Sequence, residues 1–231
     1  MPHLVITGAS AGIGAATADL FKANGFDVVN LSRRPCPIDG VANISCDLSV
    51  HNFADAIRDD LANALAGAEQ ITLVHNAALL INDNIAETES EQLRRVLEIN
   101  IVAASSLNQL LIPKMGTGSA VLYVGSTLGE KAVPNSFTYA TSKHAVVGMM
   151  RATCQDLAGS GVHTACISPG FTNTEMLREH VPADVMPQIA AMSAFERLIE
   201  PDEIAKTLLF AAQNPVLNGA TINANLGQIE R

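Results

Sequence analysis

Residues 3–14 read HLVITGASAGIG, a short apolar run that leads directly into three closely spaced glycines. The run has the length of a strand, and a helix-like segment follows the last glycine, so this stretch predicts a strand, a tight turn and a helix. Glycines let the backbone approach a pyrophosphate closely, and the N-terminus of the helix offers it free N–H groups. The spacing is G-x-x-x-G-x-G rather than the G-x-G-x-x-G of the dehydrogenase fingerprint, so the order of elements carries the prediction of a dinucleotide site. Its expected lining residues are Gly8, Ser10, Ala11, Gly12, Ile13 and Gly14.

The rest of the chain continues this alternation of strands and helices. Strands are predicted at 3–7, 27–32, 42–46, 71–75, 119–125, 162–168 and 220–224. Helices are predicted at 12–24, 51–66, 89–113, 137–159, 174–180, 184–192 and 201–212. Several strands are apolar on successive residues, which is typical of strands covered on both faces. We therefore expect one domain over residues 1–231 with a Rossmann-like, doubly wound α/β fold, in which helices flank a seven-stranded, mostly parallel sheet.

Composition excludes several classes of protein. The net charge of −9, with no basic run, argues against a nucleic-acid-binding surface. The first apolar stretch is too short for a signal peptide, and no stretch approaches the roughly 20 apolar residues that span a bilayer. The four cysteines show neither C-x-x-C spacing nor the density of a disulfide scaffold. We expect a cytoplasmic protein that has no membrane or nucleic-acid partner and binds no metal.

The end of the second predicted strand is where the ribose of a bound dinucleotide would be recognised. A hydroxyl and two guanidinium groups, Ser32, Arg33 and Arg34, stand there in place of the Asp or Glu that would bind both ribose hydroxyls. This favours NADP(H), because arginine binds a 2′-phosphate well; the alternative is a solvated loop with two ordinary exposed arginines. After the third strand, Asp47 and Leu48 are also expected to bind the cofactor. Asp47 could accept a hydrogen bond from the adenine amino group, or could instead cap the next helix.

Tyr139 and Lys143 are four residues apart, which places both on one face of a helix. A phenol with a pKa near 10 is a poor acid or base at neutral pH, but a neighbouring ammonium group lowers that pKa. Such a pair alone is a common coincidence. The position of this pair makes coincidence less plausible, because Ser126 follows directly on the fifth strand. The Ser126 hydroxyl could hydrogen-bond a carbonyl oxygen as negative charge develops on it. The alternative is that Ser126 is a turn or capping serine.

Further polar residues are expected at the same edge of the sheet. Asn100 lies inside a long apolar helix, where it would need buried partners. Asn76 and Ala77 end the fourth strand and could line the ribose of the cofactor. Pro169 and Gly170 break the chain after the sixth strand and leave Thr172 and Thr174 to face the nicotinamide carboxamide.

Together these motifs resemble the short-chain dehydrogenase/reductase family in its compact form, over essentially the whole chain. The resemblance implies that Tyr139 is the acid/base, that Lys143 lowers its pKa and holds the nicotinamide ribose, and that Ser126 orients the carbonyl. It implies that the main chain of Asn100 holds a water connecting Lys143 to solvent, and that the protein is a homodimer or homotetramer. Two departures stand out: Ala78 replaces a usual glycine, and residues 225–227 read Asn-Leu-Gly in place of Asp-Gly-Gly.

The expected function is NADP(H)-dependent hydride transfer between nicotinamide and a small-molecule carbonyl or alcohol, with ketone or aldehyde reduction favoured. Nucleotide-sugar epimerases also have a Tyr-x-x-x-Lys pair, but only about 60 residues follow Gly170, too few for their substrate domain. A protein that senses the NADP(H) ratio without catalysis is the remaining alternative. A lid is expected at 171–198, and its apolar, methionine-rich residues favour a mainly hydrophobic substrate that the sequence does not identify.

Overall fold

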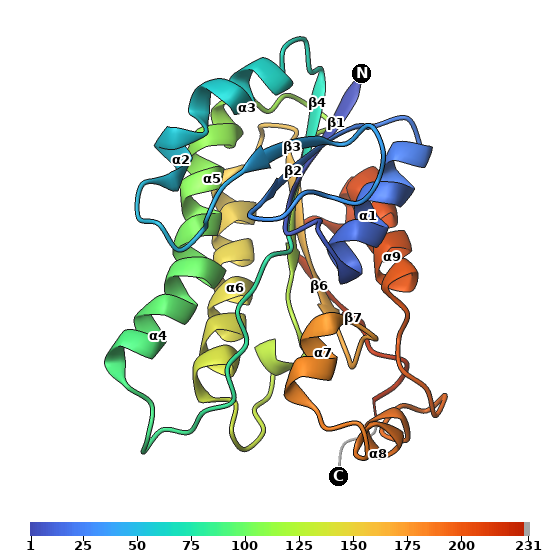
Figure 1. Cartoon of the computed structure of the whole chain (residues 1–231). Helices are drawn as coiled ribbons and strands as arrows, with labels where there is room; N and C mark the ends of the chain where they lie inside the picture. Colours follow the sequence, from blue (N-terminus) through green and yellow to red (C-terminus); the bar gives the residue numbers. More distant parts are fainter. Residues whose placement is uncertain (229–231) are drawn as a thin grey trace.

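The computed structural model describes residues 1–228 and shows a wholly parallel seven-stranded sheet in the order β3-β2-β1-β4-β5-β6-β7 (Figure 1). The order reverses between β1 and β4, the switch point at which doubly wound sheets bind ligands. The predicted fold class is confirmed, with every strand near its predicted place. The strands are β1 (Pro2–Thr7), β2 (Asp27–Ser32), β3 (Ala42–Ser45), β4 (Gln70–His75), β5 (Ala120–Val124), β6 (His163–Pro169) and β7 (Ala220–Ala224).

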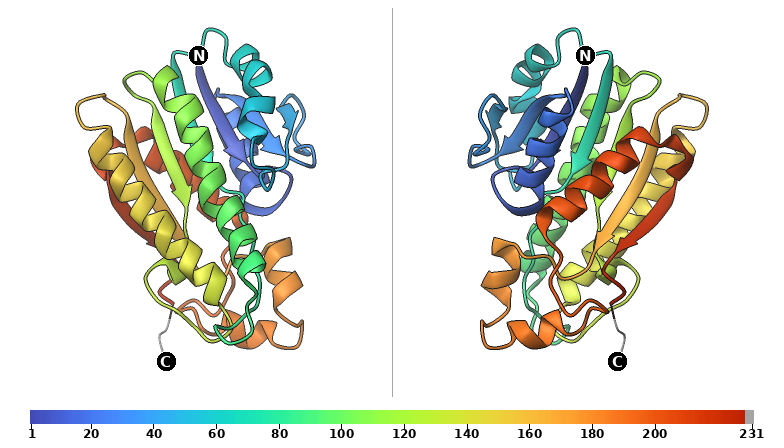
Figure 2. Two further views of the ribbon diagram at one scale, coloured as in Figure 1. Left: turned by 90° about the vertical axis from the view of Figure 1, so that its left-hand side faces the viewer. Right: turned by 90° about the vertical axis from the view of Figure 1, so that its right-hand side faces the viewer.

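Helices cover both faces of the sheet, and each layer encloses its own apolar core (Figure 2). On one face, α1 (Gly12–Ala23) packs against α9 (Pro201–Gln213). The other face is covered by α2 (Phe53–Ala56), α3 (Arg58–Ala64), α4 (Ser90–Leu97), α5 (Ala103–Leu111) and α6 (Phe137–Asp156). The central strands are buried on both sides, and all five residues of β5 are buried, as their unbroken apolar sequence predicted.

Two predicted helices are interrupted. The helix predicted at 51–66 is split at Ile57, whose backbone leaves the helical region, into α2 and α3. The helix predicted at 89–113 contains a π-helical turn, Glu98–Val102, between α4 and α5. Asn100 lies in that turn, and π-helical turns inside α-helices often occur at functional sites. Apolar periodicity predicts that a helix exists but does not show where its hydrogen bonding changes.

The expectation that no stretch could span a membrane needs one correction. Among the described residues, the helical segment Ser90–Lys114 is long and apolar enough by composition to do so. In the fold, 44% of its apolar window is buried, and Leu107 and Leu111 on α5 belong to the core of that face. Packing on the sheet therefore accounts for part of its apolar character.

Beyond the carboxyl ends of the strands, two short helices form the segment predicted to be a lid. The helices α7 (Glu175–His180) and α8 (Met186–Ala190) lie below the sheet in Figure 1. The unusual loop after β7 meets this segment, because the N–H of Ala194 donates to the carbonyl of Leu226 at 3.0 Å. The 225–227 loop therefore closes against the lid segment.

Candidate active site and cofactor groove

The glycine-rich turn has the shape that close approach of a ligand requires. Gly8 and Gly12 have positive φ angles of 73° and 54°, and a Cβ on Gly14 would collide with the carbonyl oxygen of Gly8. Helix α1 begins directly after Ala11, whose side chain cannot cap it, and its first turn contains no acidic residue. The N-terminal N–H groups of α1 are therefore suited to an anion, which is the fit that a pyrophosphate demands.

Neighbouring strands brace this turn. The side chain of Asn76 donates to the carbonyl oxygens of Thr7 and Gly8 at 2.9 and 3.1 Å. The Thr7 hydroxyl accepts from the N–H groups of Asn76 and Ala77. From β2, the Asn30 side chain accepts from the N–H of Ala9 at 2.9 Å. Asn76 was predicted to line the ribose, and its amide nitrogen holds the shape of the glycine-rich turn through these two bonds.

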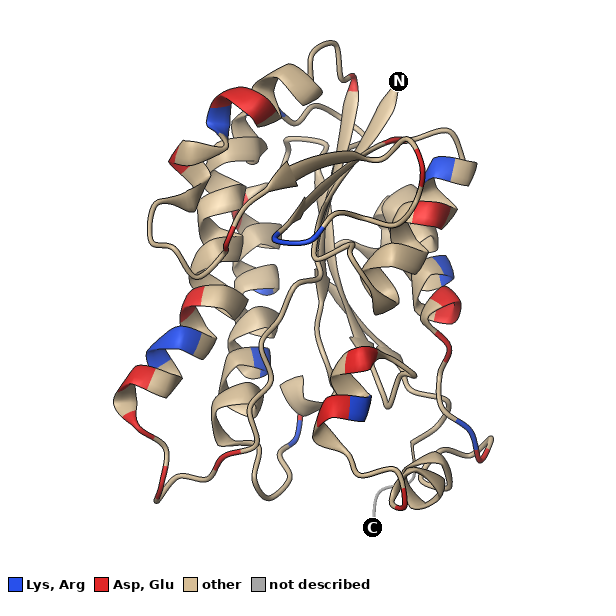
Figure 3. Ribbon diagram, viewed as in Figure 1, with Lys and Arg blue, Asp and Glu red and all other residues tan. Residues whose placement is uncertain are grey.

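The two arginines after β2, Arg33 and Arg34, are exposed. Figure 3 shows a basic segment directly after β2, whereas acidic residues are spread over many helices. The Arg34 guanidinium pairs with Glu175 on α7 at 3.1 Å, and both side chains are more than half exposed. Arg33 lies near enough to Asp47 to help lower the pKa of that carboxyl group.

The Asp47 carboxylate is held by its neighbour Ser49 and does not cap the next helix. Its carboxylate accepts from the N–H and the hydroxyl of Ser49, at 2.9 and 2.7 Å, and these bonds are the main reason its pKa is lowered. Helix α2 begins only after Asn52, so Asp47 does not cap it. Leu48 is buried in the core beside it.

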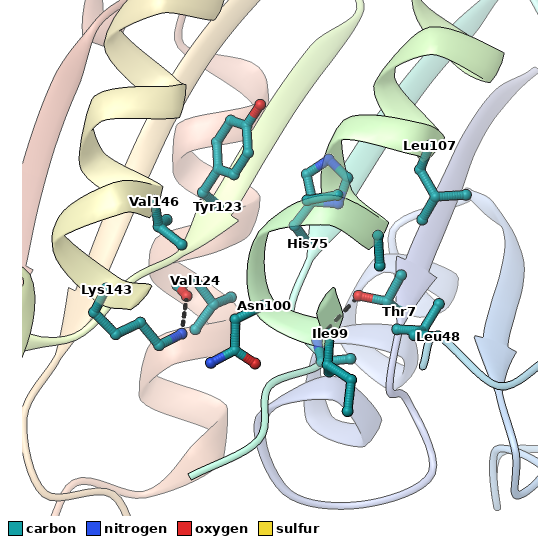
Figure 4. A pocket seen from close by; sticks show the side chains of 13 residues that line it. Thr7, Leu48, His75, Ile99, Asn100, Leu107, Tyr123, Val124, Lys143 and Val146 are labelled. Carbon is teal, nitrogen blue, oxygen red and sulfur yellow. Dashed lines mark hydrogen bonds between the residues drawn. The ribbon is translucent and has the colours of Figure 1, made fainter. Parts of the chain in front are cut away.

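The three residues expected to carry the chemistry meet at the carboxyl end of β5. Ser126 directly follows this strand, and Tyr139 and Lys143 lie in the first two turns of α6. The Ser126 side chain lies near enough to the Tyr139 hydroxyl to lower its pKa, and the Lys143 Nζ lies 5.4 Å from the centre of the Tyr139 ring. Lys143 also donates to the carbonyl of Val124 at 2.8 Å (Figure 4).

Burial dominates the electrostatics of this cluster. It raises the pKa of Tyr139 to about 12, against a smaller lowering by the hydrogen bond from Ser126. It lowers the pKa of Lys143 to about 8. Desolvation of the phenol is the largest cause of the shift at Tyr139, so the lowering of the Tyr139 pKa by Lys143 stays a prediction.

Asn100 finds the buried partners that its position predicted. Its side-chain oxygen accepts from the N–H of Leu79 at 2.7 Å, and its nitrogen donates to the Leu79 carbonyl and to the hydroxyl of Ser142. Ser142 adjoins Lys143 on α6. In Figure 4 the Asn100 side chain lies beside Lys143 in a pocket between α5, α6 and the sheet. Asn100 thus ties together α6, the π-helical turn and the loop after β4.

A chain of buried polar groups lies deeper in the same region. His75 bonds to Asn108 at 2.8 Å, Asn108 donates to the hydroxyl of Tyr123, and that hydroxyl is 3.1 Å from Thr153. Burial lowers the pKa of His75 to about 4, so the ring is neutral. In Figure 4, His75 and Tyr123 line the inner part of the pocket, away from Lys143.

The residues after β6 form hydrogen bonds that fix the start of the segment predicted to be a lid. Gly170 donates its N–H to Ala224 on β7, and the Thr172 hydroxyl donates to the Gly170 carbonyl. Thr174 caps α7, because its hydroxyl accepts from the N–H of Leu177. Its methyl group is so close to Gly12 that a Cβ there would be 3.1 Å away. The base of the lid thus touches the glycine-rich turn.

Sequence reasoning missed four contributors to the site. Asp83 accepts from the N–H of Thr138 at 3.0 Å and so fixes the start of α6 just before Tyr139. Glu175 pairs with Arg34, and His180 at the other end of α7 bonds to the carbonyl of Leu80 at 3.0 Å. Asn30 did carry a signal, as a lone amide in an apolar strand, whereas the other contacts join segments that are distant in sequence.

Comparison with known proteins identifies the class of protein. A family profile described as enoyl-(acyl carrier protein) reductase matches residues 8–228. Protein FixR of Bradyrhizobium diazoefficiens is 31% identical over 97% of this chain and 86% of its own length. The 3-oxoacyl-(acyl-carrier-protein) reductase FabG of Thermotoga maritima is 27% identical over 91% of this chain and 89% of its own. A solved short-chain dehydrogenase/reductase of Brucella melitensis, titled glucose/ribitol dehydrogenase, superposes with a TM-score of 0.89 at 26% identity, covering 100% of this chain and 97% of that one.

The chain belongs to the short-chain dehydrogenase/reductase family. Members of this family are oxidoreductases that act on CH–OH or carbonyl groups with a nicotinamide cofactor. Within residues 1–228, no group of three or more His, Cys, Asp or Glu residues is placed to hold a metal ion. All four cysteines are free thiols.

Proposed function

We propose that this protein is an NADP(H)-dependent reductase of ketones or aldehydes, in which Tyr139 is the proton donor. The observation that carries the proposal is the grouping of three side chains at the end of β5: Ser126 lies near enough to the Tyr139 hydroxyl to lower its pKa, and Lys143 is buried beside the Tyr139 ring. Nicotinamide supplies the hydride when it is bound. The chain's own residues must then hold the carbonyl, donate a proton to its oxygen and stabilise the phenolate that remains.

Ser126 and Tyr139 suit the first two tasks. Both hydroxyls lie near each other at the carboxyl edge of β5, so a carbonyl oxygen could accept from both. With a pKa raised to about 12, Tyr139 stays protonated at neutral pH and is ready to act as the acid. The half-buried Ser126 would orient the oxygen while Tyr139 transfers its proton.

Lys143 suits the third task. Its pKa of about 8 keeps most of the side chain charged at pH 7, and the charge lies over the Tyr139 ring. A fixed cation near a developing phenolate stabilises that charge in a site of low dielectric constant. The bonds from Asn100 to Ser142 and Leu79 support the position of the α6 turn that bears Lys143. As the family resemblance implies, we propose that the main chain of Asn100 holds a water that connects Lys143 to solvent, and that Tyr139 regains its proton through this water.

The preference for NADP(H) rests on the end of β2. Arg33 and Arg34 provide two exposed guanidinium groups there, and no carboxylate occupies the position of Ser32. A guanidinium pairs with a phosphate through two hydrogen bonds, whereas a carboxylate would repel it. The half-buried apolar residues of the lid favour a mainly hydrophobic substrate. They are Phe171, Met176, Leu177, Val181, Val185, Met186 and Met192.

The test is NADPH oxidation by the purified protein across ketones, aldehydes, diketones and 3-ketoacyl thioesters. Turnover with NADPH, weaker turnover with NADH and loss of turnover in Tyr139→Phe are expected. Tight NADPH binding without turnover of any class would favour a sensor of the NADP(H) ratio. We further propose a homodimer or homotetramer, which light scattering after gel filtration would measure; a monomer at micromolar concentration would contradict it.

A further inference from the structure

We propose that Glu175 is a specificity residue for the cofactor, because its carboxylate competes with the 2′-phosphate of NADP(H) for Arg34. This inference rests on the proposed use of Arg34 as a phosphate ligand. It adds a residue of the lid helix to the determinants of cofactor choice.

The geometry places Glu175 within reach of the same guanidinium. Its Oε2 lies 3.1 Å from the Arg34 side-chain nitrogen, across 141 positions of sequence. Arg34 follows β2, whose end reads the ribose in this fold, and Glu175 is the first residue of α7. A 2′-phosphate that pairs with Arg34 would have to displace this carboxylate or lie beside it, and two like charges in contact repel each other.

The position of Glu175 is fixed at both ends of its helix. Just before it, Thr174 caps α7 and packs against Gly12 of the glycine-rich turn. At the far end, the His180 Nε2 bonds to the Leu80 carbonyl at 3.0 Å, and the side chain of Asn82 donates to the His180 carbonyl at 3.4 Å. The helix therefore runs from the glycine-rich turn to the loop after β4, and the backbone of Glu175 is held near Arg34.

The ion pair is weak enough for a ligand to break it. The two side chains are 65% and 55% exposed, and pairs of this kind stabilise proteins by about 1 kcal/mol or less. Removing the carboxylate should therefore tighten NADPH binding by about 3- to 5-fold. NADH has a hydroxyl in place of the phosphate and does not need Arg34, so its affinity should stay the same.

The experiment measures dissociation constants of NADPH and NADH by calorimetry for the wild type, Glu175→Gln and the control Glu179→Gln. Glu179 is an exposed residue one turn further along the same helix, so its substitution removes the same charge away from Arg34. We expect tighter NADPH binding in Glu175→Gln alone, with NADH unchanged in all three. In an Arg34→Gln background, the Glu175→Gln effect should disappear, which a general change in the lid would not produce.

Weaker NADPH binding in Glu175→Gln, equal changes for both cofactors, or a gain that persists without Arg34 would each overturn the inference. The wild-type ratio of the two constants tests the proposed cofactor separately. If the wild type bound NADH as tightly as NADPH, the proposed preference would fail, while the response of NADPH to Glu175→Gln would still decide the role of Glu175.

Discussion

Two regions of this protein differ in burial: the candidate catalytic cluster, which is Ser126, Tyr139 and Lys143, and the exposed edge after β2, which is Arg33, Arg34 and their neighbour Glu175. Tyr139 and Lys143 are nearly fully buried on α6, and Lys143 donates a hydrogen bond to Val124 at the end of β5. Arg34 and Glu175 are mostly exposed and are joined by one ion pair. In the proposed function, the core therefore fixes the geometry of the chemistry, whereas exposed charges that single substitutions can alter set the choice of cofactor.

The largest effect should come from removing one oxygen in the buried cluster. Tyr139→Phe is expected to lower the reductase rate by about 10²–10⁴-fold, because the proton donor is lost. Its NADPH affinity should remain that of the wild type. Steady-state rates and calorimetric titration measure the two quantities.

The other tyrosine is the matched control. Tyr123→Phe removes a hydroxyl that bonds Asn108 and lies close to Thr153, so it should cost about 1–3 kcal/mol of stability and leave the rate nearly intact. Equal losses of rate in the two variants would show that the effect of Tyr139→Phe is structural.

The pH profile tests the buried cation. Because the pKa of Lys143 is lowered to about 8, reduction should slow above pH 8, approaching tenfold per pH unit as the ammonium group loses its proton. In Lys143→Arg the side chain stays charged, so any residual activity should lack this break. A wild-type rate that is constant up to pH 10 would contradict the role assigned to Lys143.

The glycine-rich turn is packed so closely at Gly14 that this position should tolerate no side chain. Gly14→Ala places a Cβ against the Gly8 carbonyl and 2.6 Å from the Asn76 side chain, and should destabilise the fold by about 3 kcal/mol. Gly148→Ala is the control, because its site on α6 is exposed and open, and alanine should stabilise that helix by up to about 1 kcal/mol. Chemical denaturation measures both; similar stabilities would show that the turn is not tightly packed.

Burial of His75 should make the stability of the fold sensitive to acid. Its pKa is about 4 in the folded protein and about 6.5 in the unfolded chain, so the unfolded state takes up the proton first as the pH falls. Stability should therefore decline between pH 6.5 and pH 4, by up to about 3 kcal/mol from this residue. His75→Gln should show a smaller decline over that window in urea titrations; an identical decline would assign the acid sensitivity to other groups.

The smallest effect is expected at the exposed edge. Arg33→Gln should weaken NADPH binding by about 3- to 10-fold, leave NADH binding unchanged and leave stability the same, because the side chain is exposed. Calorimetry with both cofactors measures it. A large loss of stability would mean that this edge is built like the core.

The sequence predicted the two regions unequally. Strand positions and the meeting of Ser126 with Tyr139 followed from periodicity and spacing, since both depend on local pattern and on the parallel sheet. The partner of Arg34 did not, because Glu175 is brought there by the tertiary path of the lid. The π-helical turn at Asn100 and the raised pKa of Tyr139 were also beyond the pattern, since they depend on long-range packing and on the depth of burial.

Transfer of deuterium from NADPH that carries deuterium at both C4 positions tests the central claim most directly. Mass spectrometry of the products from a panel of ketones and aldehydes would follow the label. We predict that the wild type places one deuterium on the former carbonyl carbon of at least one substrate, and that Tyr139→Phe places almost none in the same time. Tight NADPH binding with no transfer to any carbonyl, or equal transfer by Tyr139→Phe, would contradict the assignment of this site as a reductase.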